Sequence, residues 1–492
     1  MYNPAGSLSE VARGLAGAAG SVWAVRVDRS VRAAPSGQGE GPKRAARGYR
    51  ERWLLAIAMT GVAARRSPRA RARARLWADA SRAVPVRESS QRSGSDGPSD
   101  VPGVDENFGA RVKRFARNAR IELAALNGES GLLALARSSG MPERYTETLT
   151  QLYDAYKQEV TKKYNDLGVA SDTTLHLFKN MLKIYAEELS SPFQFPSFHR
   201  AVRGPAYDYY ALGNAYVHHL IDYSTSLALH PDRMHQIVSA AQNGQNVVLL
   251  SNHQSEADAA FMPLLAAPAF PELGESVIYI VGDRVVTDLL CKPFSMGRNL
   301  LCVHSKKRMD DDEAQVKNMK RRQNMRSVKE MERLLSEGGK ILWLAPSGGR
   351  DRREVSTGVV EPDRFDPSNV EMIRKIISKD SMPTTRCFPM AMFTHDILPP
   401  PTTLQQEIGE ERTVNFSKVG IGFGKEIDVE NDTPDQIFEI LLAEYWSMME
   451  LLASPANTPD QLPSDTCARP WQWDSADDVR VSAGVNAKAS AA

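Results

Sequence analysis

The chain has 492 residues, 42% of them hydrophobic, which allows a sizeable core divided among several domains. Its net charge of +1 conceals an asymmetry: residues 1–100 hold 18 Lys and Arg against 8 Asp and Glu, a net of +10, while the remaining residues hold 43 against 52, a net of −9. A nucleic-acid-binding protein concentrates positive charge on its folded part, so this balance argues against a nucleic-acid partner.

The cysteines limit the chemistry further. Cys291, Cys302, Cys387 and Cys467 form no C-x-x-C pair and have no histidines at metal-ligand spacing. The sequence therefore predicts neither a metal site nor a disulfide framework, and a reducing compartment fits it best. We expect the protein to work without a metal or a cofactor.

Residues 1–103 have the composition of an organelle transit peptide followed by a linker. They are rich in Ala, Arg, Ser and Gly, poor in acids, and include a low-complexity arginine run. A disordered basic tail would have the same composition, so both interpretations stay open. Trp53–Ala64 is apolar but too short to span a bilayer. At the other end, residues 455–492 are small and polar, which predicts a disordered tail.

Between about 104 and 200 the patterns are helical. In the stretch Pro142–Tyr164, apolar and aromatic residues recur every three or four positions, and Thr173–Glu188 repeats this spacing. Such stripes are far more often packed cores than ligand sites. We therefore predict an N-terminal helical domain over 104–200.

From 201 to 454, apolar runs typical of buried strands alternate with helical patterns. This alternation predicts an α/β domain with a mostly parallel mixed sheet covered by helices, beside the helical bundle. Ser327–Leu335 is one of the expected helices, with Ser327 and Glu330 as a capping box. Val419–Phe423 is expected as a late edge strand. The main strands are expected at Asn246–Leu250, Val277–Val281, Leu300–Val303, Lys340–Leu344 and Arg386–Met392.

The first strand leads into a polar segment that contains His253 and Asp258. An unbroken helix would hold their side chains roughly 140° apart, so they can meet only if His253 lies in a loop and Asp258 in the first turn of a helix. Asp258 then holds one imidazole nitrogen and leaves the other to take a proton from a hydroxyl. Alternatively, Ser255 and Asp258 form a capping box and Asp258 satisfies only backbone N–H groups.

Two later loops are basic. The segment after Leu300–Val303 contains Lys307 and Arg308, and the segment after Lys340–Leu344 contains Arg350 and Arg352 behind two glycines. Paired guanidinium groups suit a phosphate, although a solvated face or a surface turn would also fit. Loops at the carboxyl ends of parallel strands converge on one crevice. A base beside a phosphate site indicates a small phosphorylated alcohol, and no Walker or Rossmann motif favours a nucleotide.

Four segments of the sequence are NHQSEAD, DLLCKPFSMGRNLLCVHSKKR, APSGGRDR and CFPMAM, and two more are SPFQFPSFHRAVRGPAYDYY and HDILPPP. Together they resemble the glycerol-3-phosphate acyltransferases, and among them the soluble plastid type. The resemblance runs from about Glu143 to Trp446. It implies transfer of a fatty acyl group from acyl carrier protein, or from acyl-CoA, to the sn-1 hydroxyl of glycerol 3-phosphate in the chloroplast stroma.

Carried over residue by residue, the resemblance makes His253 the general base and Asp258 its partner. It assigns Lys307, Arg308, Arg350 and Arg352 to the substrate phosphate. Arg308 is a departure, because plant members commonly have histidine there; arginine keeps a donor and adds a permanent charge.

Two competing functions stay open. An acyltransferase acting on 1-acylglycerol 3-phosphate would share the H-x-x-x-x-D motif, but it would normally be embedded in the membrane. No apolar run of about 18 residues occurs here, so we expect at most peripheral membrane contact. A non-catalytic lipid- or carrier-binding protein is the other alternative, which the intact His253, Asp258 and loop arginines oppose.

Overall fold

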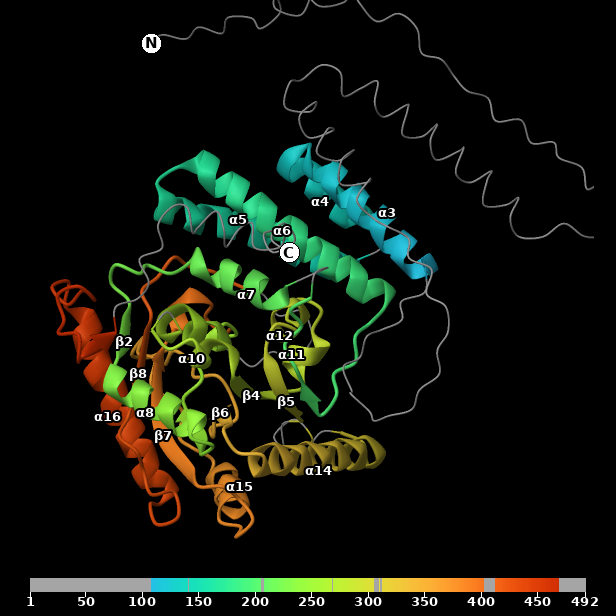
Figure 1. The fold of residues 1–492 in the computed structure, drawn as a ribbon. Coiled ribbons are helices and arrows are strands. Elements are labelled where there is room, and N and C mark those ends of the chain that lie inside the picture. The colour runs from blue at the N-terminus through green and yellow to red at the C-terminus, as the bar shows by residue number, and fades with distance from the viewer. Residues whose placement is uncertain are drawn as a thin grey trace, which may run out of the picture. The chain divides into compact units, whose positions relative to one another are not determined.

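The computed structural model describes residues 108–139, 141–204, 208–267, 269–304, 309, 312–401 and 412–468 (Figure 1). The predicted leader, 1–103, lies outside the described residues, as do Lys307, Arg308 and the chain beyond 468. Residues 103–492 form one compact unit. The predicted boundary between a helical and an α/β domain near residue 200 stays a prediction.

Four helices open the described chain: α3 (Phe108–Ala125), α4 (Gly128–Ser138), α5 (Glu143–Tyr164) and α6 (Leu167–Ser190). Asp166 caps α6, because its side chain accepts the backbone N–H groups of Gly168 and Val169 at 2.7 and 3.1 Å. The predicted N-terminal helices are confirmed. The apolar stripe of α5 is buried as its spacing predicts, and comprises Leu149, Leu152, Tyr153, Tyr156 and Val160.

The strands form one sheet in the order β1-β5-β4-β6-β3-β7-β8-β2-β9. The central strands β5, β4, β6, β3 and β7 are all parallel, whereas β1 pairs antiparallel with β5, and β8 with β7. The central strands are the five predicted ones, so the α/β class with a mostly parallel sheet is confirmed. The strands are β1 (Phe198–His199), β2 (Leu227–Leu229), β3 (Asn246–Ser251), β4 (Val277–Gly282), β5 (Asn299–Val303), β6 (Ile341–Leu344), β7 (Thr385–Phe393), β8 (Gly420–Phe423) and β9 (Cys467–Ala468).

Helices and single turns connect these strands. The long ones are α7 (Tyr209–His218), α8 (Pro231–Gln242), α14 (Ala314–Ser336), α15 (Pro367–Ile377) and α16 (Pro434–Ala453). The short ones are α9 (Asp258–Phe261), α10 (Glu272–Glu275), α11 (Arg284–Thr287), α12 (Lys292–Ser295), the π-helix η2 (Met262–Ala266) and the 3₁₀ turn η3 (His395–Ile397). No helix in the described part of the chain has the length and apolar character that a membrane crossing requires.

The alternation of β3 shows how helices cover both faces of the sheet. Val247 and Leu249 belong to a core shared with α5, α6, α7 and α8, whereas Val248 and Leu250 belong to a core shared with α14, α15 and α16. Figure 1 shows α5, α6 and α7 on one side of the sheet and α14 and α15 on the other. Two-sided burial explains why this strand is apolar without interruption.

Two local predictions are wrong. Ser327 and Glu330 form no capping box, because Ser327 lies well inside α14, where its Oγ donates to the carbonyl of Cys302 at 2.6 Å. β8 is not an edge strand, because β2 and β9 extend the sheet beyond it. β9 pairs with β2, so Cys467 and Ala468 of the predicted tail belong to the sheet.

Candidate active site

Three loops meet at the carboxyl edge of the parallel strands. β3 lies between β6 and β7, so the segments that follow these strands leave the sheet side by side. We call residues 252–257, after β3, the histidine loop, and residues 345–353, after β6, the arginine loop. Asn252 fastens the first of these to β7, because its Nδ2 donates to the carbonyl of Met392 at 2.9 Å and its Oδ1 accepts the N–H of Met392 at 2.7 Å.

His253 and Asp258 are in direct contact. The Nδ1 atom of His253 lies 2.8 Å from Oδ2 of Asp258, with His253 in the histidine loop and Asp258 as the first residue of α9. The Asp258 side chain is 2% exposed, and that of His253 is 28% exposed. A carboxylate on Nδ1 fixes the tautomer that leaves Nε2 without a proton, which is the form that accepts one.

The Asp258 carboxylate is held by three further donors. Oδ2 accepts the backbone N–H of Gln254 at 2.8 Å. Oδ1 accepts the backbone N–H of Ser255 at 3.2 Å and the hydroxyl of Thr394 at 2.6 Å. The two alternatives drawn from the sequence are therefore not exclusive: Asp258 satisfies backbone N–H groups and also contacts the imidazole. With both oxygens hydrogen-bonded, the carboxylate has one orientation to offer the ring.

Trp343 supports the imidazole from β6. The two rings meet edge to face, with centroids 5.7 Å apart and planes at 82°. Trp343 itself is 4% exposed, so it shields the side of the His253 ring that it contacts from solvent. The ring therefore has a fixed position as well as a fixed tautomer.

The arginine loop is joined to the histidine loop through Asp351. Its backbone N–H donates to the carbonyl of His253 at 2.6 Å, and its Oδ2 accepts from Nδ2 of Asn252 at 2.9 Å. Oδ1 accepts the backbone N–H of Asp363 at 3.0 Å. Burial raises the pKa of Asp351 to about 8, although these hydrogen bonds lower it in part. Asp351 therefore connects the two loops inside the protein and does not balance the charges of Arg350 and Arg352.

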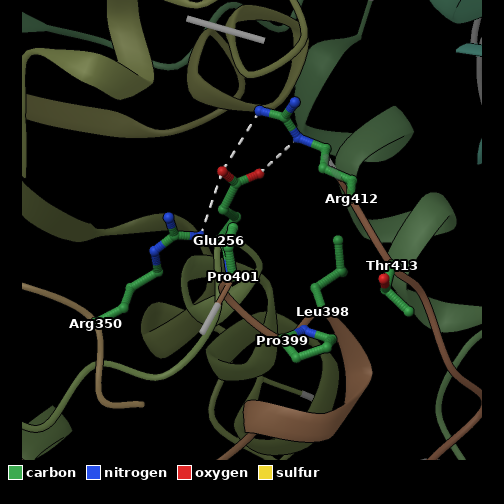
Figure 2. A pocket seen from close by; sticks show the side chains of 7 residues that line it. All are labelled: Glu256, Arg350, Leu398, Pro399, Pro401, Arg412 and Thr413. Carbon is green, nitrogen blue, oxygen red and sulfur yellow. Dashed lines mark hydrogen bonds and ion pairs between the residues drawn. The ribbon is translucent and has the colours of Figure 1, made fainter. Parts of the chain in front are cut away.

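Arg350 contacts the carboxylate of Glu256, in the histidine loop, at 3.5 Å (Figure 2). Gly348 turns the arginine loop at a φ of +72°, which glycine adopts without strain. Arg352 lies two residues further along, and its Nη1 donates to the carbonyl of Arg350 at 3.2 Å. The Nε atom of Arg352 is buried without a hydrogen-bond partner among the described residues.

Glu256 also pairs with Arg412, as Figure 2 shows. The Arg412 Nε atom lies 3.0 Å from Oε2 of Glu256, and its Nη2 atom lies 3.1 Å from Asp288. Burial raises the pKa of Glu256, but the charges of Arg412 and Arg350 outweigh it and hold that pKa below its ordinary value. Glu256 is therefore an anion near neutral pH and orients both guanidinium groups. Beside them lies a small pocket, also lined by Leu398, Pro399, Pro401 and Thr413.

The predicted site residues that the structure describes lie in the two loops and in the first turn of α9. His253, Asp258 and Arg350 are linked through the contacts above, and Arg352 follows in the same loop. Lys307 and Arg308 lie outside the described residues. In the described ranges, no group of three His, Cys, Asp or Glu residues is placed to hold a metal ion.

Comparison with known proteins adds the family. Residues 233–392 match the family model described as Acyltransferase. Over 340 residues the chain is 40% identical to the chloroplastic glycerol-3-phosphate acyltransferase of Pisum sativum. The aligned residues make up 67% of this chain and 71% of the relative. The chain belongs to the glycerol-3-phosphate acyltransferase family. The resemblance read from the motifs is thereby confirmed.

Two other chloroplastic members of the glycerol-3-phosphate acyltransferase family give similar matches. The protein of Cucurbita moschata is 41% identical over 298 residues, or 60% of this chain and 65% of the relative. That of Arabidopsis thaliana is 40% identical over 309 residues, or 62% of this chain and 66% of the relative. The chain thus spans just under two thirds of the length of these two relatives.

In this member of the glycerol-3-phosphate acyltransferase family, four residues support the site in ways that were not predicted from the sequence. Thr394, directly after β7, and Trp343, in β6, contact the Asp258–His253 pair, and Asp351 and Arg412 hold the loops in place. Thr394 and Arg412 are more than a hundred residues from their partners in the sequence, so no local spacing could reveal them. Asp351 stands between two arginines in the sequence, but its burial in the fold decides that it joins the loops.

Proposed function

We propose that this member of the family transfers a fatty acyl group from acyl carrier protein, or from acyl-CoA, to the sn-1 hydroxyl of glycerol 3-phosphate. The product is 1-acyl-sn-glycerol 3-phosphate. The relatives named above carry the corresponding name, which supports this substrate. The single observation that carries the proposal is the 2.8 Å contact between His253 Nδ1 and Asp258, beside a loop that presents Arg350.

In this proposal His253 is the general base. Its Nε2 atom takes the proton of the C1 hydroxyl as the oxygen attacks the carbonyl carbon of the acyl thioester. The C–O bond forms, the C–S bond breaks, and the departing thiolate takes the proton back from His253. No acyl-enzyme is needed, because the hydroxyl is activated directly. Asp258 stabilises the imidazolium that exists between the two proton transfers.

The phosphate of the acceptor is assigned to Arg350 and Arg352 of the arginine loop and to Lys307 and Arg308 of the loop after β5. Glycerol 3-phosphate carries close to two negative charges near neutral pH, and guanidinium groups bind such an oxyanion through two parallel hydrogen bonds. Glu256 contacts Arg350 and Arg412 together and so holds the Arg350 guanidinium group in one orientation. This arrangement supports a guanidinium group that is already oriented before the substrate arrives.

The proposed compartment is the plastid stroma. The relatives are named as chloroplastic, and the composition of residues 1–103 fits a transit peptide. We propose no nucleic-acid partner and at most a peripheral contact with membranes.

The test is an acyl-transfer assay with the purified full chain. Acyl carrier protein and acyl-CoA donors are each offered with glycerol 3-phosphate, with 1-acylglycerol 3-phosphate and with glycerol. We expect transfer to glycerol 3-phosphate, at rates far above those of a His253→Ala variant. Preferential acylation of 1-acylglycerol 3-phosphate would move the protein to the next acylation step. Donor binding without transfer to any acceptor would make it a carrier- or lipid-binding protein.

A further inference from the structure

α14 carries an exposed stripe of methionine and basic side chains. The stripe consists of Met319, Arg322, Met325, Arg326 and Lys329, whose directions on the helix fall within about 120° of one another. Met319 and Met325 are 57% and 62% exposed. Arg322, Arg326 and Lys329 are exposed and have no ion-pair partner among the described residues. We call these five residues the basic stripe.

Only the C-terminal half of α14 packs on the sheet. Its buried residues are Ser327, Met331, Leu334 and Leu335, on the face opposite the basic stripe. Val316 has the same direction as Leu334, since eighteen residues make about five turns. Yet Val316 is 37% exposed and Leu334 only 2%. The N-terminal half of the helix therefore extends beyond the sheet.

Two contacts show at which edge it extends. Asn324 forms hydrogen bonds of 2.7 and 2.9 Å with the backbone of His304, directly after β5, whereas the Leu335 carbonyl accepts from Asn246, the first residue of β3, at 2.8 Å. α14 thus runs from the carboxyl edge of the strands to their amino edge. The ten residues before Asn324 project about 15 Å past the carboxyl edge. His253 and Arg350 lie at that same edge.

We propose that the basic stripe docks the protein part of the acyl donor, an acidic carrier protein. This inference rests on the proposed function and deepens it by locating the donor. Met319 and Arg322 lie on the part of α14 that projects past the carboxyl edge, and the other three residues continue the basic stripe beside the sheet. Positive charge that begins beyond this edge steers an anionic partner toward it, and methionine side chains adapt to the surface of a partner. The stripe is about 15 Å long, the length of roughly three helical turns.

The composition of the basic stripe favours a protein partner over two other anionic partners, which are the phosphates of coenzyme A and an anionic membrane. The phosphates of a coenzyme A donor need a compact site, and methionines between the charges add nothing to their binding. An anionic membrane attracts basic helices, but helices that lie in a bilayer surface bury an apolar face of Trp, Phe or Leu beside the charged one. The basic stripe presents methionine alone as its apolar component.

The test reverses two charges in the full chain, with Arg322→Glu and Arg326→Glu combined. Steady-state rates are measured with acyl carrier protein and with acyl-CoA at several salt concentrations. We expect kcat/KM for the carrier donor to fall by about tenfold or more and to lose most of its salt dependence. The acyl-CoA value and the KM for glycerol 3-phosphate should change less than about twofold. A double lysine variant at the same positions should retain wild-type rates.

The matched control combines Arg137→Glu with Lys425→Glu, which changes the net charge equally. Arg137 lies in the last turn of α4, and Lys425 follows β8, which runs antiparallel to β7 and so ends at the opposite edge of the sheet. This control should leave both donors unaffected. Docking is disproved if the Arg322/Arg326 variant keeps its carrier kinetics, if both donors lose rate equally, or if only binding to anionic vesicles is lost. A wild-type chain that acylates glycerol 3-phosphate with neither donor would refute the proposed function instead.

Discussion

The backbone N–H of Asp351 donates to the carbonyl of His253 at 2.6 Å, which joins the arginine loop to the residue proposed as the base. Because the side chain of Asp351 also accepts from Asn252, the neighbour of His253, the two loops are connected at two successive residues. A movement of one loop therefore moves the other. The groups assigned to the phosphate and to the hydroxyl are positioned as one unit, and small displacements in such a unit cost much of the rate.

His253→Ala should lower kcat by about 10²–10⁴-fold, the usual effect of removing a positioned base. Binding of glycerol 3-phosphate, measured by calorimetry, should persist because the arginine loop is intact. His235→Ala, an exposed histidine on α8, is the control and should keep the wild-type rate. A His253→Ala enzyme with near-normal kcat would exclude this residue as the base.

Arg350→Ala and Arg352→Ala should each raise the KM for glycerol 3-phosphate by roughly one to two decades, since a charge-assisted contact contributes about 1.5–3 kcal/mol. The KM for the acyl donor should change much less. Arg352→Lys should restore only part of the affinity, because an ammonium lacks the planar fork. Arg353→Ala is the control within the same loop. If the first two variants weaken only the carrier donor, these arginines bind the donor and the assignment of the phosphate is wrong.

Thr394→Val should lower kcat by roughly tenfold with little change in either KM, because the hydroxyl that donates to Asp258 at 2.6 Å is lost while the volume is kept. Thr394→Ser retains the donor and should recover most of the rate. Recovery by serine separates this positioning role from a packing role. If serine and valine are equally impaired, the methyl group matters and the hydrogen bond does not.

Asp351 should make stability depend on pH. Its pKa is about 8 in the folded protein against an ordinary 3.8, so the folded state holds a proton that the unfolded chain releases between these values. Its contribution to the free energy of unfolding is complete below about pH 4 and is lost as the pH rises through about 8. Urea titrations should therefore show the wild type losing stability relative to Asp351→Asn across this range. Asp380→Asn, at an exposed aspartate, should follow the wild type throughout.

Removal of residues 1–100 should leave a soluble and active enzyme. The removed segment has the composition of a transit peptide and contains none of the motifs that carry the site. The measurement compares specific activity and thermal unfolding of the shortened and full chains. Aggregation or loss of activity in the shortened chain would show that this segment belongs to the fold.

The sequence predicted the five central strands and the pair His253 and Asp258, because periodicity and spacing within one loop are local properties. It could not predict what holds that pair, since Thr394 and Trp343 reach it only through the order of the strands. The errors have similar causes. The spacing of Ser327 and Glu330 matches a capping box, but a longer helix had already begun. β8 was expected at the edge because the strands beyond it, β2 and β9, have only three and two residues and gave no strand pattern.

The histidine loop draws its supports from a distant part of the chain. Gln254 Oε1 accepts the N–H of Thr394 at 2.8 Å, and Asn252 is hydrogen-bonded to Met392. Glu256 forms an ion pair with Arg412. During synthesis the ribosome completes every residue from His253 to Asp258 well before it reaches these three partners. In the emerging chain the H-x-x-x-x-D motif is therefore complete before the residues that hold it in place exist. Contacts between residues more than a hundred positions apart must form before the first turnover.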